Sequence, residues 1–146
     1  MSGKKVIVIG SGFGGMSLAA LLAKDGHSVT IIEKNDQPGG RAIVWKEKGF
    51  VFDMGPSWYL MPDVFEKFFA EFGKKPDDYY KLLRLNPAYR VFYNKDEIVD
   101  ISPDFEQNLQ LFERYQKGGR EQLKKYLAAA EYQYQIAMNE FIYKEY

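Results

Sequence analysis

A glycine-rich segment between two short β-branched runs is the feature that most limits how this chain can fold. Val6–Ile9 is apolar throughout, as is typical of a buried parallel strand, and Val29–Ile32 is rich in β-branched residues. Between them, residues 16–24 carry leucines and alanines at helical spacing, and Gly26 stands where a left-handed residue ends a helix. This segment therefore predicts a strand, a tight turn, a helix and a second strand, joined by a right-handed crossover.

The glycines of the turn have the spacing G-x-G-x-x-G and open the predicted helix. Gly10 permits the tight turn, Gly12 lets a pyrophosphate approach the backbone, and Gly15 lets the helix pack closely on the strand. The helix N-terminus offers free N–H groups and a partial positive charge to phosphates. Glu33, at the end of the second strand, is placed to accept hydrogen bonds from a ribose hydroxyl. The sequence thus predicts a dinucleotide site in an α/β, Rossmann-like domain.

Two further turns indicate which dinucleotide binds. Gly39-Gly40-Arg41 follows Glu33 closely, and many flavoproteins use such a loop near the pyrophosphate and the flavin, whereas NAD-binding units do not need it. Asp53–Ser57 is another backbone turn, at a distance that suits passage beside the isoalloxazine ring. We therefore predict FAD as the cofactor. The predicted cofactor-binding residues are Gly10, Ser11, Gly12, Phe13, Gly14, Gly15, Glu33, Lys34, Gly40, Arg41, Gly55, Pro56 and Ser57.

These motifs together resemble a known group of proteins. The segment from Gly10 to Arg41 is similar to the extended FAD fingerprint of the flavin amine oxidase and carotenoid desaturase superfamily. Within that superfamily, Gly49–Trp58 and Pro62–Phe65 resemble bacterial-type phytoene desaturases. The resemblance implies an FAD-dependent oxidoreductase that removes hydrogen from phytoene, or from a related apolar polyene of carotenoid biosynthesis. It assigns no catalytic residue within this stretch.

Three alternatives share the scaffold. A flavin amine oxidase has the same fingerprint, but the match across Asp53–Phe65 argues against it. A retinol-type saturase would use similar motifs in the opposite redox direction. A non-enzymatic interaction module, such as the GDP dissociation inhibitors, has lost flavin binding, whereas the glycine-rich turn, Glu33 and Gly40-Arg41 are intact here.

The remainder of the chain predicts two regions. We expect an incomplete Rossmann-like FAD-binding domain over residues 1–100 and the beginning of a mostly helical substrate-side region over residues 101–146. The expected elements are a hairpin near 42–52, a helix after Pro62, a strand pair at 89–93 and 97–101, a helix opening with Ser102-Pro103, and a last helix from about Arg120. Because one βαβ unit cannot make a doubly wound sheet, we expect a fragment of a longer enzyme, inactive by itself.

The composition limits which ligands and partners the protein can bind. The chain has 20 Lys and Arg residues and 20 Asp and Glu residues, so it lacks the basic excess typical of nucleic-acid-binding proteins. It has no cysteine and only one histidine, too few for a metal site built from these ligands. No segment approaches the ~20 apolar residues of a spanning helix. An apolar polyene resides in the bilayer, so we expect a cytoplasmic protein held peripherally at the inner face of the membrane. The cations near the last helix, here named the basic cluster, are Lys117, Arg120, Lys124 and Lys125.

Overall fold

The computed structural model describes residues 3–144, which fall into two compact units dividing between Lys81 and Leu82. The sequence placed a domain boundary later, near residue 100. The difference is the hairpin of residues 89–101, which lies in the second compact unit. The limits of the domains in a complete protein stay a prediction.

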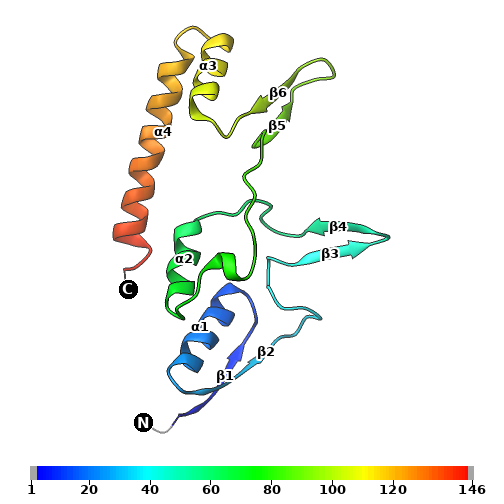
Figure 1. Cartoon of the computed structure of the whole chain (residues 1–146), viewed down its shortest axis with the longest axis vertical. Helices are drawn as coiled ribbons and strands as arrows, with labels where there is room; N and C mark the ends of the chain where they lie inside the picture. Colours follow the sequence, from blue (N-terminus) through cyan, green and yellow to red (C-terminus); the bar gives the residue numbers. More distant parts are fainter. Residues whose placement is uncertain (1–2, 145–146) are drawn as a thin grey trace. The chain divides into compact units, whose positions relative to one another are not determined.

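The first unit opens with the predicted strand–turn–helix–strand arrangement. β1 (Lys5–Ile9) pairs in parallel with β2 (Ser28–Ile32), and α1 (Phe13–Lys24) connects them (Figure 1). Helix and sheet pack through small and β-branched side chains, since Val8 and Ala19 are both buried. Gly26 has φ 85° and donates its N–H to the Ala23 carbonyl, which ends α1 as expected. The α/β, Rossmann-like prediction is confirmed at this level.

One face of the β1–β2 sheet is apolar and exposed. Because successive side chains of a strand point to opposite faces, Ile7 and Ile9 lie on the face opposite buried Val8. Ile9 is 87% exposed, and its register partner Ile32 is exposed beside it. Such side chains are typical of a sheet face that packs against further elements, as in α/β sheets covered on both sides.

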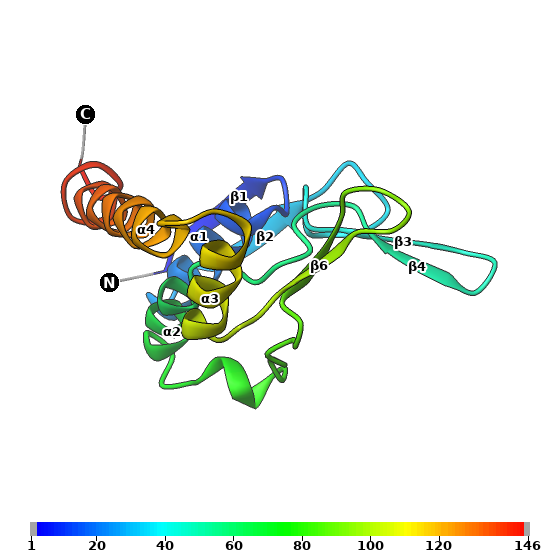
Figure 2. The ribbon, with the colours of Figure 1, turned by 90° about the horizontal axis from the view of Figure 1, so that it is seen from above.

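The first unit continues with a hairpin and a helix. β3 (Val44–Glu47) and β4 (Phe50–Asp53) are antiparallel, and their hairpin projects away from β1, α1 and β2 in both views (Figure 1, Figure 2). α2 (Pro62–Ala70) follows, with a short 3-10 turn, η1 (Pro76–Asp78), after it. The rings of Phe13 and Phe65 meet edge to face at 5.8 Å, which joins α1 to α2. The predicted hairpin and the predicted helix after Pro62 are both confirmed.

The second unit combines a hairpin with two helices. β5 (Tyr89–Phe92) pairs with β6 (Ile98–Ile101) as predicted. α3 (Phe105–Tyr115) and α4 (Gly119–Ile136) form a helical hairpin, and a π-helical turn, η2 (Ala137–Phe141), continues α4. Leu109 of α3 is 1% exposed. No helix formed by residues 3–144 is both long and apolar enough to cross a bilayer.

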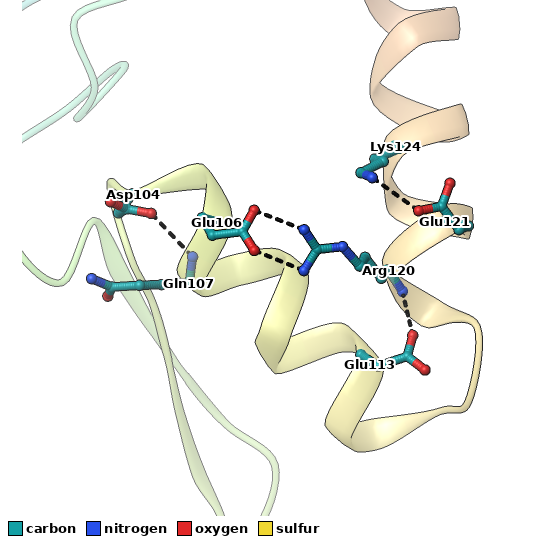
Figure 3. Close-up of polar contacts among 7 residues, drawn as sticks. All are labelled: Asp104, Glu106, Gln107, Glu113, Arg120, Glu121 and Lys124. Carbon is teal, nitrogen blue, oxygen red and sulfur yellow. Dashed lines mark hydrogen bonds and ion pairs between the residues drawn. The ribbon is translucent and has the colours of Figure 1, made fainter.

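The start and the end of the helical hairpin differ from expectation. Asp104, not Ser102, is the N-cap of α3, and its carboxylate accepts the Gln107 N–H at 3.0 Å (Figure 3). The Ser102 hydroxyl accepts the Asp104 N–H instead, so Pro103 precedes the helix rather than opening it. An aspartate at the cap also brings a negative charge to the positive helix end. Regular α4 ends at Ile136, and the predicted continuation to Tyr146 lies partly outside the described residues.

Candidate functional site

The glycine-rich turn, Gly10–Gly15, connects the end of β1 to α1. Gly10 has φ 96° and donates its N–H to the Ile32 carbonyl at 2.7 Å, which ties the turn to β2. A Cβ on Gly15 would lie 2.1 Å from the Gly10 carbonyl oxygen, so α1 approaches the turn as closely as glycine allows. A Cβ on Gly12 would have only Gly40 near it, at 3.9 Å. The fold therefore needs glycine at 10 and 15, whereas at 12 the protein leaves open space.

The N-terminus of α1 is available to an anion. Its N-cap residue is Gly12, which has no side chain to cap the helix, and no acidic residue lies in the first turn. The first hydrogen bond of the helix runs from the Met16 N–H to the Gly12 carbonyl at 2.9 Å. The N–H groups of residues 13–15 therefore have no partner within the helix. The helix dipole adds partial positive charge at the same point.

Glu33 lies directly beside this turn. Its Oε2 accepts both the Ser11 hydroxyl at 2.7 Å and the Ser11 N–H at 2.8 Å, and its Oε1 accepts the Asn35 N–H at 3.0 Å. These bonds, the Ser11 hydroxyl first among them, lower the pKa of Glu33 from 4.5 to about 2. The carboxylate is therefore ionised at every pH near neutrality and acts only as an acceptor. The sequence predicted the position of Glu33 but not its pairing with Ser11.

The Gly39–Arg41 loop returns to the glycine-rich turn. The Gly39 N–H donates to the Ser11 carbonyl at 2.8 Å. Gly40 has φ 64°, and a Cβ on it would lie 3.0 Å from the Gly12 Cα. Both the positive φ and the close contact with Gly12 require glycine at position 40.

The turn at residues 53–57 contacts the Gly39–Arg41 loop through Gly55. A Cβ on Gly55 would lie 2.1 Å from the Arg41 carbonyl oxygen, so the backbones of the two loops are in direct contact. The structure thus brings together Gly10–Gly15, Glu33, Gly39–Arg41 and Gly55, which form the candidate site. Lys34, Arg41, Pro56 and Ser57 are exposed at its edge. Arg41 forms no ion pair with any of residues 3–144, so its charge is open to an anionic ligand.

An apolar groove begins at the same turn. Phe13 follows Gly12 and lines a groove of about 730 Å³ between α1 and α2. The other wall is aromatic, with Phe65, Phe68 and Tyr80 among its residues. Tyr80 is fixed by a hydroxyl–hydroxyl bond of 2.5 Å to Tyr59. Burial, followed by this bond, raises the pKa of Tyr59, so its hydroxyl stays neutral around pH 7.

The basic cluster of the second unit is partly neutralised. The Arg120 guanidinium makes two contacts with the Glu106 carboxylate, at 2.7 and 3.0 Å, and Lys124 pairs with Glu121 at 2.9 Å (Figure 3). Glu113 accepts the N–H groups of Gly118 and Arg120, which caps α4. The cluster therefore presents less positive charge to anionic lipid than its sequence indicated.

The chain is similar to known proteins over nearly its whole length. A family model described as an NAD(P)-binding Rossmann-like domain matches residues 8–72, a range that contains the entire candidate site. The structure of an oxidoreductase from Methanosarcina mazei superposes with a TM-score of 0.50 at 24% identity, covering 86% of this chain and 30% of that one. This likeness concerns the fold alone.

Two curated relatives are closer in sequence. A carotenoid 3,4-desaturase from Haloarcula japonica is 50% identical over 99% of this chain and 29% of its own length. A 4,4'-diapophytoene desaturase (4,4'-diaponeurosporene-forming) from Staphylococcus aureus is 37% identical over 97% of this chain and 28% of its own length. The chain spans less than a third of each relative. The similarity to carotenoid desaturases extends over nearly the whole of this chain.

Proposed function

We propose that this chain is the FAD-binding part of an enzyme that desaturates a carotenoid or a carotenoid precursor such as phytoene. One observation carries the proposal. The uncapped N-terminus of α1, the ionised Glu33 and the Gly39–Arg41 loop converge on one small region. They do so in a chain that is 50% identical to a carotenoid 3,4-desaturase.

The donors and acceptors of the candidate site fit a dinucleotide. The N–H groups of Phe13, Gly14 and Gly15 would bind the pyrophosphate, and the open space at Gly12 would let it approach. Glu33 would accept a ribose hydroxyl with the lone pairs that Ser11 and Asn35 leave free. The Gly39–Arg41 loop, closed onto Gly12 and unnecessary in NAD-binding units, favours FAD over NAD. Arg41 would meet a phosphate, while Gly55, Pro56 and Ser57 would pass beside the flavin.

The chemistry of desaturation places few demands on this part of the protein. When bound, the flavin would accept the hydride that a C–H bond of the polyene releases, with a proton lost from the neighbouring carbon. The residues of this chain bind and orient the cofactor. None of the described residues is assigned as an acid or a base.

The substrate implies where the enzyme works. A polyene of this kind is nearly insoluble in water, so its enzyme must collect it from a bilayer. We infer peripheral association with the inner face of the cell membrane, driven by burial of apolar surface. Because Arg120 and Lys124 are paired, we expect lipid charge to matter less than apolar area.

The activity is tested with the complete protein, FAD, an added electron acceptor and liposomes that hold either phytoene or a carotenoid with a conjugated chain. A desaturase lengthens the conjugated chain, so visible absorbance should appear or move to longer wavelength. An amine oxidase would ignore both polyenes and release peroxide from amines, and a saturase would bleach the conjugated substrate. The proposal would be refuted if flavin-loaded protein gave neither new visible absorbance nor a shift to longer wavelength with either polyene.

Glu33→Ala should weaken FAD binding by the complete protein about tenfold to a hundredfold. A hydrogen bond to a charged acceptor contributes about 1.5–3 kcal/mol, and the variant loses the ribose acceptor. Titration of the apoprotein with FAD measures the loss. Glu47→Ala is the matched control, because Glu47 is an exposed glutamate on the β3–β4 hairpin. Equal affinities of the Glu33 variant and the wild type would remove the ribose assignment.

A further inference from the structure

We infer that Ser11 is the positioning residue of the candidate site, holding the Glu33 carboxylate and the Gly39–Arg41 loop in place before the dinucleotide arrives. The inference rests on the proposed function and deepens it. It gives Ser11 a role distinct from direct contact with the cofactor, because its polar groups are already engaged with the protein.

Ser11 is built into the site rather than exposed in it. It is 4% exposed, although it lies in a turn. Its hydroxyl and its N–H both donate to Oε2 of Glu33, at 2.7 and 2.8 Å. Its carbonyl accepts the Gly39 N–H at 2.8 Å. One residue therefore links the glycine-rich turn to the end of β2 and to the second loop.

Hydrogen bonds alone orient Glu33. No lysine or arginine within residues 3–144 forms an ion pair with it, although Lys34 is its neighbour in sequence. Ser11 supplies two of the three bonds described above, and Asn35 supplies the third. The Ser11 hydroxyl also makes the shortest of the three. Without that hydroxyl, Oε2 keeps one bond and the glutamate side chain regains rotamer freedom that binding must remove again.

A double-mutant cycle separates positioning from a general structural role. The complete protein carries Ser11→Ala, Glu33→Ala or both, and FAD affinity of each apoprotein is measured by titration. We expect Ser11→Ala alone to weaken FAD about three- to tenfold. In the Glu33→Ala background the same change should alter affinity by less than about twofold, because no carboxylate remains to be positioned.

Two further variants complete the experiment. Ser11→Thr keeps a hydroxyl and should restore most of the affinity. Ser17→Ala removes a hydroxyl from α1 that donates to the Phe13 carbonyl and does not touch Glu33, and it should bind FAD like the wild type.

Three results would overturn the inference. An unchanged affinity of Ser11→Ala would show that the hydroxyl does not matter. An equal loss in both backgrounds would show that Ser11 acts independently of Glu33. Wild-type protein that binds no FAD would refute the proposed function as well, so the two failures are distinguished by the wild-type titration.

Discussion

Gly12→Val should abolish FAD binding by the complete protein while leaving the protein folded. The protein itself tolerates a side chain at this position, because a Cβ there would meet only the Gly40 Cα at 3.9 Å. Gly12 has φ −71° and ψ 176°, an extended conformation that valine adopts readily. The fold therefore does not use this space, and the proposed function assigns it to the pyrophosphate. Flavin absorbance after purification measures binding, and circular dichroism during heating measures folding.

Gly12→Ala provides a graded comparison. Its single methyl group fills less of the space, so we expect weakened rather than abolished binding. A Gly12→Val protein that purifies yellow, with flavin in stoichiometric amount, would contradict the assignment of the glycine-rich turn to the pyrophosphate.

Gly15→Ala, unlike Gly12→Val, should destabilise the fold itself. The new Cβ would lie 2.1 Å from the Gly10 carbonyl oxygen, with the Val8 side chain at 3.5 Å behind it. The Gly10 carbonyl cannot move away without separating α1 from β1, and overpacking of this kind costs about 1–3 kcal/mol or more. FAD binding should fall with it, since the shift displaces the turn. Thermal or urea unfolding of the complete protein measures the loss of stability.

Gly14→Ala is the matched control for this prediction. Gly14 is the preceding residue of the same helix, and nothing lies within 4 Å of a Cβ placed on it. Alanine there should leave stability unchanged or raise it by about 0.5–1 kcal/mol, because it replaces glycine within a helix. Equal stability of the Gly14 and Gly15 variants would contradict the close packing of α1 on the turn.

The βαβ unit was predictable because its signals are local. Each signal depends on residues only a few positions apart: the β-branched runs, the helical spacing of small residues, and the glycines before and after α1, Gly12 and Gly26. The hairpin of residues 44–53 was predictable for the same reason, since Gly49 lies between two runs with alternating side chains. The need for glycine at 10 and 15 followed from the known order of the motif, and the geometry agrees with it.

Contacts between segments were not predictable in the same way. The sequence placed Ser11 and Glu33 in one site, but only the parallel pairing of β1 with β2 brings the hydroxyl to the carboxylate. The contact of Gly55 with the Arg41 carbonyl depends on the path of the β3–β4 hairpin between them. No spacing rule in the sequence states either contact.

Competition between adjacent groups explains the remaining differences. Ser102 and Asp104 are both good N-cap residues, and the choice of Asp104 depends on the Ser102 backbone being bonded to the Asn108 side chain instead. The charge of Arg120 looked available in the sequence, whereas folding places Glu106 of the preceding helix opposite it. Both outcomes follow from tertiary structure rather than from local preference.

The close spacing of the site along the chain bears on the order in which the protein assembles during synthesis. All the contacts that define the site fall between Gly10 and Gly55, so they can form as soon as this stretch leaves the ribosome. At that stage Ile7, Ile9 and Ile32 still have no cover. A ligand that binds only the folded form stabilises it by mass action. The cofactor proposed above would then stabilise the folded βαβ unit early, before the apolar face of its sheet is covered.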